Sequence, residues 1–234
     1  MPIKRRRTIL VVVIACIAVA ASSPYVWRAA ALQWAKHSAR RTMSKLTADE
    51  IQILNITPAP VTLPKPAAAE DHLVRIGFGS YTLKVPQPDS HSNRSKVLLL
   101  DYPRFQVIVF PPFSATELNR LAVQAHFKDA FDEQAAAYHT RWDQLDAQPD
   151  LPSLRRFLSL IAQKISRTAC TEQFERPALR GLIFAPDPPK GDTVVEVYVP
   201  QLQALCGLHF VDRKQMSLDD IHQFLALLQF EDAK

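Results

Sequence analysis

The stretch VLLLDYPRFQVIVF, residues 97–110, decides the fold class of this 234-residue chain. Two apolar runs, residues 97–100 and 105–110, flank the polar segment Asp101-Tyr-Pro-Arg104, in which proline fixes φ and cannot donate to a strand ladder. Two strands joined by so short a turn predict a hairpin, and therefore antiparallel pairing. Upstream, Tyr81, Leu83 and Val85 alternate with polar residues, which is the period of a half-buried strand.

A helix is expected directly after this hairpin. Ser114 and Glu117 match the S-x-x-E capping box, and Phe113 and Leu118 occupy the two hydrophobic-staple positions. We therefore predict that the helix begins at Ser114. Its apolar stripe starts with residues 118–125 and shifts toward another face from Phe127 onward.

The remaining elements complete an α+β pattern. A second helix is predicted over residues 151–165, strands over 181–184, 193–199 and 207–211, and a last helix with Ser217 as its cap and Asp220 at the box position. The order of strands, two helices, strands and a C-terminal helix predicts an α+β domain over residues 73–234, with a mainly antiparallel sheet and helices packed on it. This order over residues 73–230 resembles that of the PsbP-type α/β/α sandwiches. The resemblance is one of architecture and implies no function.

The amino-terminal segment predicts one transmembrane helix within residues 1–27. KRRR at residues 4–7 precedes 20 uncharged residues, 8–27, which as a helix span about 30 Å, the thickness of a bilayer's hydrocarbon core. The cationic start favours an amino terminus in the cytoplasm, and hence an extracytoplasmic body on the periplasmic or lumenal side.

Two alternatives to a retained signal anchor stay open. Ala18-Val19-Ala20 supplies the small-x-small pattern at which a signal peptide is cleaved. Val13-Ile14-Ala15-Cys16 resembles a bacterial lipobox, in which Cys16 would be acylated. The retained anchor is favoured because the uncharged run is longer than a typical signal-peptide core, and because apolar residues continue after Cys16.

Two segments separate the anchor from the body. Residues 28–56 predict a basic amphipathic stalk whose cations are available to anionic headgroups, with a purely solvated stalk as an equal alternative. Trp27 and Trp34 stand where an aromatic belt would lie, although an ordinary amphipathic helix would look the same. Residues 57–72 are rich in proline and alanine and predict a stiff, extended linker.

The charge distribution argues against a nucleic-acid partner. The net charge is +5, but residues 1–50 hold nine Lys and Arg against two Asp and Glu, a balance of +7, and the rest hold 19 against 21, a balance of −2. The body therefore lacks the positive excess that drives phosphate binding.

Two groups of residues are candidate sites in the body. Cys170 and Cys206 could form a disulfide on the exported side of a membrane, and the alternative is two buried, inert thiols. His126, Asp129 and Glu133, spaced three and four apart, would share one face of the helix begun at Ser114 and could bind a metal ion. An ordinary solvated acidic face is the favoured interpretation of that trio.

Motifs for catalysis are missing from the sequence. It contains no G-x-S-x-G, H-E-x-x-H, P-loop or G-x-G-x-x-G, and only 5 glycines, so we expect no cofactor and no catalytic residue. We expect a membrane-anchored, extracytoplasmic binding or accessory domain that is not an enzyme and that has an unknown protein partner. An envelope hydrolase with a site built from dispersed residues is the alternative.

Overall fold

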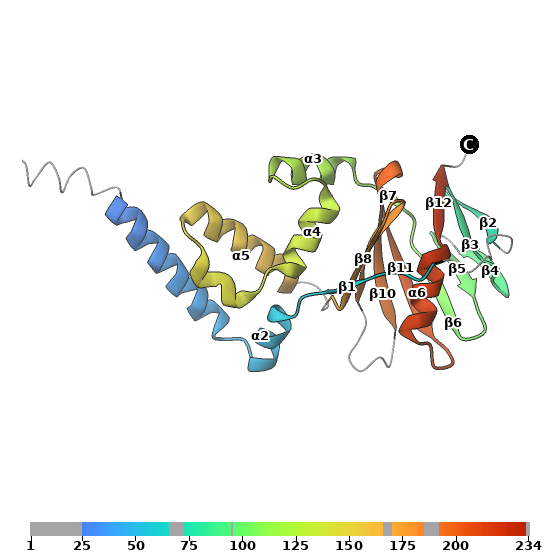
Figure 1. The fold of residues 1–234 in the computed structure, drawn as a ribbon, viewed down its shortest axis with the longest axis horizontal. Coiled ribbons are helices and arrows are strands. Elements are labelled where there is room, and N and C mark those ends of the chain that lie inside the picture. The colour runs from blue at the N-terminus through green and yellow to red at the C-terminus, as the bar shows by residue number, and fades with distance from the viewer. Residues whose placement is uncertain (1–24, 66–72, 95, 166–169, 185–191, 233–234) are drawn as a thin grey trace, which may run out of the picture. The chain divides into compact units, whose positions relative to one another are not determined.

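A computed structural model describes residues 25–65, 73–94, 96–165, 170–184 and 192–232 (Figure 1). The chain divides into two compact units. Unit 1 comprises the described residues up to Asn55 together with Arg141–Ala162, and unit 2 comprises Ile56–Thr140 together with the described residues from Gln163 onward. The predicted span at residues 8–27 lies almost wholly outside the described residues. None of the helices that are described is long and apolar enough to cross a membrane.

Unit 1 is helical. It contains the helix over residues 25–43, α2 (Ala48–Asn55), the 3-10 helix η2 (Trp142–Ala147) and most of α5 (Leu151–Ile165). The prediction of a helix over residues 151–165 is thus confirmed with the same bounds. The buried apolar side chains that the structure describes in this unit are Met43, Leu54, Leu145, Leu154, Phe157 and Ile161.

The stalk prediction for residues 28–56 needs a structural correction. Its helical part does not stand alone, because Leu32, Ala35 and Ala39 pack against the core that η2 and α5 complete. The Lys36 ammonium donates to the Asp146 carbonyl at 2.9 Å and is buried. Apolar residues on one face of a helix need a partner surface, and a segment more than 100 residues downstream supplies it.

Unit 2 is built on a nine-stranded sheet and a three-stranded sheet. The large sheet has the order β1-β8-β9-β10-β11-β6-β5-β4, with β7 also paired to β11, and the small sheet has the order β12-β3-β2. The strands are β1 (Ala59–Val61), β2 (Leu73–Phe78), β3 (Tyr81–Pro86), β4 (Ser90–Arg94), β5 (Val97–Asp101), β6 (Phe105–Val109), β7 (Phe113–Ser114), β8 (Glu172–Arg176), β9 (Leu179–Phe184), β10 (Thr193–Val199), β11 (Ala204–Asp212) and β12 (Gln229–Asp232).

The pairing confirms the mainly antiparallel α+β class. β5 and β6 form the predicted hairpin, with Leu98 opposite Val109 and Asp101 opposite Gln106. β1 pairs with β8 in parallel, whereas the other strand pairs described are antiparallel. Residues 59–61 therefore belong to the sheet, although the sequence predicts a free linker there, and residues 66–72 of that linker lie outside the described residues.

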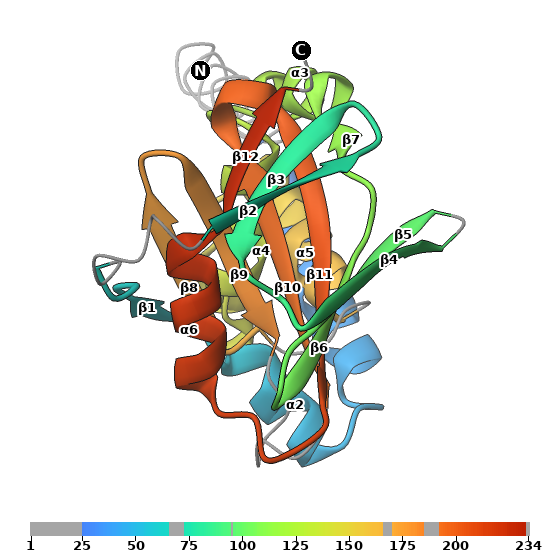
Figure 2. The same cartoon turned by 90° about the vertical axis from the view of Figure 1, so that its right-hand side faces the viewer.

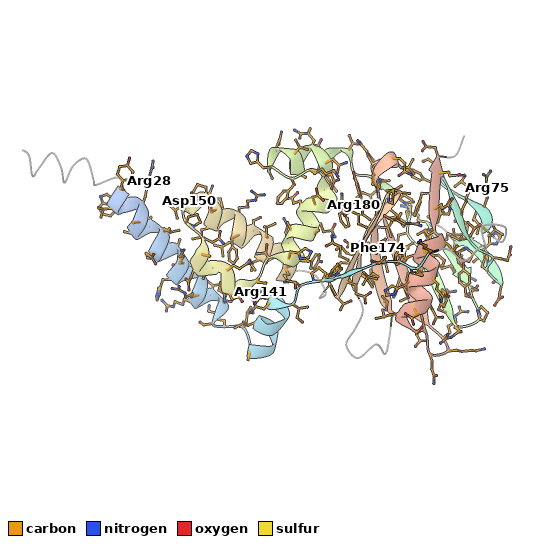
Figure 3. All side chains as sticks on the ribbon, in the orientation of Figure 1. Arg28, Arg75, Arg141, Asp150, Phe174 and Arg180 are labelled. Atoms are coloured by element: carbon orange, nitrogen blue, oxygen red, sulfur yellow. The ribbon has the colours of Figure 1, made fainter. Side chains whose placement is uncertain are left out.

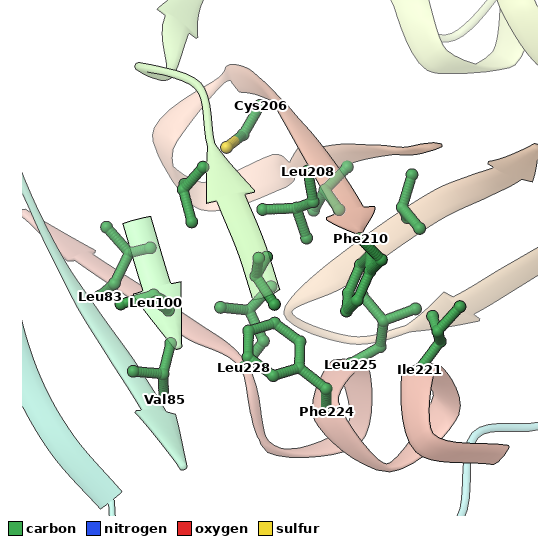
Figure 4. Close-up of a cluster of buried hydrophobic side chains, with 14 of the residues drawn as sticks. Leu83, Val85, Leu100, Cys206, Leu208, Phe210, Ile221, Phe224, Leu225 and Leu228 are labelled. Atoms are coloured by element: carbon green, nitrogen blue, oxygen red, sulfur yellow. The ribbon is translucent and has the colours of Figure 1, made fainter. Parts of the chain in front are cut away.

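One face of the large sheet is closed by α6 (Leu218–Leu227) and the small sheet (Figure 2). Leu208 and Phe210 of β11 lie in one apolar cluster with Phe224 and Leu225 of α6 and Leu83 of β3 (Figure 4). We call this the closed face.

The helix α6 begins as the sequence predicts. The Ser217 hydroxyl accepts a hydrogen bond from the Asp220 N–H at 3.2 Å, and the Asp220 carboxylate accepts one from the Ser217 N–H at 2.8 Å, which completes the capping box. The Arg176 guanidinium donates to the Ala226 and Leu228 carbonyls at the other end. The chain then forms β12, which the sequence did not predict.

The opposite face of the large sheet is covered by α4 (Ala130–His139). Phe131 and Tyr138 of α4 pack there with Leu182 and Phe184 of β9 and with Tyr198 of β10. Successive residues of a strand point to opposite faces, and Tyr198 accordingly lies on this face while Val197 and Val199 lie on the closed face. We call the side covered by α4 the open face.

The carboxyl end of α4 is held by a buried cation. Lys164, in the last turn of α5, is 4% exposed. Its ammonium donates to the carbonyls of Ile56 at 2.6 Å, Tyr138 at 3.0 Å and Thr140 at 3.1 Å, all within unit 2. Tyr138 and Thr140 end α4, where unsatisfied carbonyls and the helix dipole favour a positive charge.

Candidate functional site

A cavity of about 570 Å³ lies on the open face of unit 2. The residues that line it come from the segment around β7, from α3 (Thr116–Gln124), from α4, from the end of α5 and from β10 and β11. They are Phe110, Pro111, Phe113, Leu118, Leu121, Ala130, Glu133, Gln134, Gln163, Glu196, Leu205, Cys206 and Gly207. We call this cavity the groove. Its size falls within the range of ligand sites in proteins.

One wall of the groove is apolar and open to solvent. Phe110, Phe113, Leu118 and Leu121 are between 41% and 54% exposed. The Phe110 N–H donates to the Gly207 carbonyl at 2.9 Å, and its ring lies over Gly207, which has no side chain to keep the ring away. Four large apolar side chains gathered on one exposed surface are unusual in a soluble domain, and such patches are typical of sites of association.

The other side of the groove is polar and acidic. The Gln134 amide donates to the Glu196 carboxylate, which fixes both side chains over the sheet. Glu133 is half-buried in the first turn of α4, and its carboxylate makes no ion pair or hydrogen bond with any residue that the structure describes. The groove therefore combines large apolar surfaces with carboxylates, and no Lys or Arg is among its lining residues.

Cys206 is among the lining residues, but its thiol belongs to the apolar cluster on the closed face and is protonated. Burial raises its pKa to about 12, and the Sγ atom lies 3.3 Å from the Phe110 carbonyl. A thiol with so high a pKa is neutral at physiological pH, and only the thiolate is an effective nucleophile. Cys206 therefore offers the groove no nucleophile.

The predicted site at His126, Asp129 and Glu133 is wrong as a shared helical face. The helix ends at Gln124, and His126 adopts a φ of 66° in the turn that separates α3 from α4. Asp129 is the N-cap of α4, where its carboxylate accepts a hydrogen bond from the Asp132 N–H at 2.9 Å. Only Glu133 reaches the groove. Among the described residues, no group of three or more His, Cys, Asp and Glu side chains could hold a metal ion.

Asp129 is committed to a buried ion network instead. Arg180 of β9 is 7% exposed, and its guanidinium pairs with Asp129 at 2.9 Å, with Asp132, and with Glu175 at 3.2 Å. It also lies 4.4 Å from the centre of the Phe131 ring (Figure 3 labels Arg180). Burial alone would lower the pKa of Arg180, but the bond to Asp132 and the neighbouring carboxylates raise it. This network fixes the start of α4 against the sheet.

The start of the preceding helix also differs from its prediction. Ser114 belongs to β7, and α3 has Ala115 at its N-cap with no side-chain hydrogen bond. Glu117 pairs with Arg120 rather than with the N-cap, and this bond lowers the pKa of Glu117. Ser114 pairs with Ala204 in the sheet, and its hydroxyl accepts a hydrogen bond from the Thr116 N–H at 3.3 Å rather than from the Glu117 N–H that a capping box requires. Phe113 and Leu118 consequently point to the groove instead of forming a staple.

Cys170 and Cys206 are free, buried cysteines, so the structure does not contain the disulfide that the sequence suggests. Cys170 belongs to the cluster on the open face and Cys206 to the cluster on the closed face. Residues on opposite faces of a sheet are separated by the backbone between them, which keeps the two sulfurs from bonding. Burial raises the pKa of Cys170 to about 12 as well.

Comparison with known proteins yields no match to a family model, to a curated protein or to a solved structure. The resemblance of the element order to PsbP-type sandwiches therefore stays a prediction.

Proposed function

We propose that this protein is a membrane-anchored, extracytoplasmic binding domain that holds a segment of a partner protein in the groove. The partner segment would carry one or two large apolar side chains next to a Lys or Arg. The observation that carries this proposal is the exposed apolar wall formed by Phe113, Leu118 and Leu121, facing the unpaired carboxylate of Glu133.

The membrane part of the proposal comes from the sequence. The cationic residues 4–7 and the uncharged residues 8–27 support a retained single-pass anchor, with the body on the periplasmic or lumenal side. Anchoring confines the groove to a thin layer next to the bilayer. A tethered domain meets its partner at a high effective concentration, so even a groove of moderate affinity is occupied.

Charge supports a cationic polypeptide as the occupant. Large aromatic and aliphatic side chains in a pocket supply most of the affinity of protein interfaces. Glu133 and the Gln134–Glu196 pair favour a donor or a cation at the polar side, because a carboxylate desolvated by a bound ligand needs a partner. A negatively charged ligand would meet like charges there.

No observation favours the alternative of an envelope hydrolase. The lining residues include no histidine, and the Cys206 thiol is held in its neutral form. The carboxylates of Glu133 and Glu196 lie at the polar side of an open groove.

A peptide selection on the full chain tests the proposal. The chain, reconstituted in lipid nanodiscs, is panned against random peptides displayed on phage. We expect the enriched peptides to combine Leu, Phe or Trp with a neighbouring Lys or Arg. Leu121→Asp should weaken their binding at least about tenfold, because it removes a wall residue and adds a charge to an apolar surface.

The matched control is Val123→Asp, on the same helix. Val123 is exposed but does not line the groove, so this change should leave peptide binding intact. Glu133→Gln should weaken binding of the basic peptides and reduce its dependence on salt. Enrichment of acidic peptides, or equal loss with Leu121→Asp and Val123→Asp, would contradict the proposal.

A further inference from the structure

The helix over residues 25–43 has one face committed to unit 1. Leu32, Ala35, Ala39 and Met43 pack into the core of this unit. On the same side, Lys36 bonds to the Asp146 carbonyl. These contacts fix the rotation of the helix about its own axis and therefore decide which residues point away from the unit.

The outward face carries a stripe of two tryptophans and one arginine. Trp27, Trp34 and Arg41 are spaced by seven residues, which is close to two helical turns, so they lie in a line along one side. This side is opposite Leu32 and Met43. The two indoles are 73% and 72% exposed. Tryptophan is usually well buried in folded proteins, so two such side chains on one exposed line indicate a surface that covers them.

The charges along this helix indicate an anionic surface. Arg28 and Arg41 are exposed, and their guanidinium groups pair with no described residue (Figure 3 labels Arg28). Residues 1–50 carry a net charge of +7. Tryptophan and arginine together suit the boundary of a bilayer, where indole rings lie at the level of the headgroups and cations meet lipid phosphates.

We propose that Trp27, Trp34 and Arg41 form a membrane-contact stripe, with which this helix lies along the surface of a bilayer that contains anionic lipids. The uncharged run that begins at residue 8 leads into this helix, and Pro24 is a residue type that starts a new helix, so the chain can change direction before Trp27. The inference depends on the proposed function only in that anchoring brings the helix to a bilayer. It does not involve the groove.

Lipid quenching of a single tryptophan tests this inference. The chain has 3 tryptophans, and the third, Trp142, packs against Phe157 with ring centres 6.1 Å apart. Full-length Trp27→Phe/Trp142→Phe therefore reports on Trp34 alone. In vesicles of phosphatidylcholine and phosphatidylglycerol, we expect blue-shifted emission and a loss of about half the intensity with lipids brominated near the headgroup. Lipids brominated near the chain end should quench less.

A matched control moves the tryptophan to a neighbouring face. Gln33 is exposed and lies about 100° around the helix from Trp34. Adding Gln33→Trp and Trp34→Phe should reduce quenching at least about twofold if the stripe is the contact. Arg41→Glu, or vesicles of phosphatidylcholine alone, should also reduce quenching of Trp34.

The outcomes separate this inference from the proposed anchoring. If the chain does not float with the vesicles in a density gradient, anchoring fails. If it floats but the Trp34 emission is unquenched and that of a fully hydrated indole, the stripe does not contact lipid and the inference is overturned. Equal quenching at positions 33 and 34 also overturns it, as does a blue shift of Trp34 without lipid quenching, which would indicate a protein contact.

Discussion

The two faces of the large sheet in unit 2 differ in how completely they are covered. On the closed face, α6 and the small sheet bury a continuous apolar cluster that includes Leu208, Phe210 and Phe224. On the open face, α4 covers one part and leaves the groove beside it, with Phe113 and Leu121 exposed. The difference indicates that the closed face supplies stability, whereas the open face leaves apolar side chains exposed, as the proposed role in binding requires.

The largest effect is expected for a substitution that forces the closed face apart. A Cβ atom on Gly181 would lie 2.3 Å from the Phe174 ring and 2.9 Å from the Glu196 carbonyl. Gly181→Val should therefore lower the free energy of unfolding by about 3 kcal/mol or more, measured by urea unfolding in detergent with circular dichroism. Gly77→Ala, where nothing lies within 4 Å, is the control and should change stability little. A Gly181→Val variant as stable as the parent would show that the Phe174 ring can move away at little cost.

A second substitution loosens the helix that covers the open face. Lys164→Met keeps the length of the side chain but removes the cation from the carbonyls of Ile56, Tyr138 and Thr140. We expect a loss of about 2 kcal/mol, because charge-assisted hydrogen bonds disappear and buried acceptors are left behind. Hydrogen exchange should rise first at the carboxyl end of α4. Lys128→Met, at an exposed lysine, should be neutral, and an equal effect at both lysines would argue against a local role for Lys164.

The pH dependence of stability tests whether both faces of the sheet exclude water from their buried thiols. In the folded chain, the pKa values of Cys170 and Cys206 are raised to about 12, against a usual value of 9.0. The folded state therefore holds these protons more tightly than the unfolded state. Between pH 9 and pH 12 only the unfolded thiols ionise, so stability should fall with rising pH by about 1.4 kcal/mol per pH unit for each thiol.

Other groups titrate in the same range, so the contribution of each thiol is a difference between slopes. Cys206→Ala and Cys170→Ala should each reduce, by a similar amount, the slope with which the free energy of unfolding falls as pH rises. Urea unfolding at several pH values measures this slope. If only Cys206→Ala reduces this slope, water reaches Cys170 on the open face.

The smallest change in stability is expected on the wall of the groove. Leu121 is 45% exposed, so Leu121→Gln should alter the free energy of unfolding by less than about 0.5 kcal/mol. The same substitution should still weaken the selected peptides in a fluorescence-polarisation assay. Loss of stability together with binding would mean that Leu121 belongs to the core and that the open face is not a separate recognition surface.

Local patterns in the sequence predicted the elements whose signals are local. The apolar spacing of α5, the turn at Asp101-Tyr-Pro-Arg104 and the capping box at Ser217 all involve residues within a few positions of one another. The break between α3 and α4 had a signal as well. The shift of the apolar stripe at Phe127, followed by Asp129 as a helix cap, marks a second helix.

The groove could not be predicted because its parts are distant in the sequence. Phe110 meets Gly207 only because β11 pairs with β6 and with β7, and that register is not visible in either segment alone. The exposure of Leu118 and Leu121 is equally non-local. Their spacing predicted a buried stripe, but Ala122 is the buried residue of α3. Nor did the sequence show that residues 141–162 join the amino-terminal helix in unit 1.

The contacts of Lys164 have a mechanical consequence. The chain passes from one unit to the other after Asn55, Thr140 and Ala162, and the carbonyls of Ile56 and Thr140 meet the ammonium of Lys164 within two residues of these three passages. A pulling force transmitted along any of these three backbone segments would therefore act on the hydrogen bonds of the Lys164 ammonium. Under force, the hydrogen bonds that join the three segments should break in one step, visible as a single rupture in an optical-trap recording.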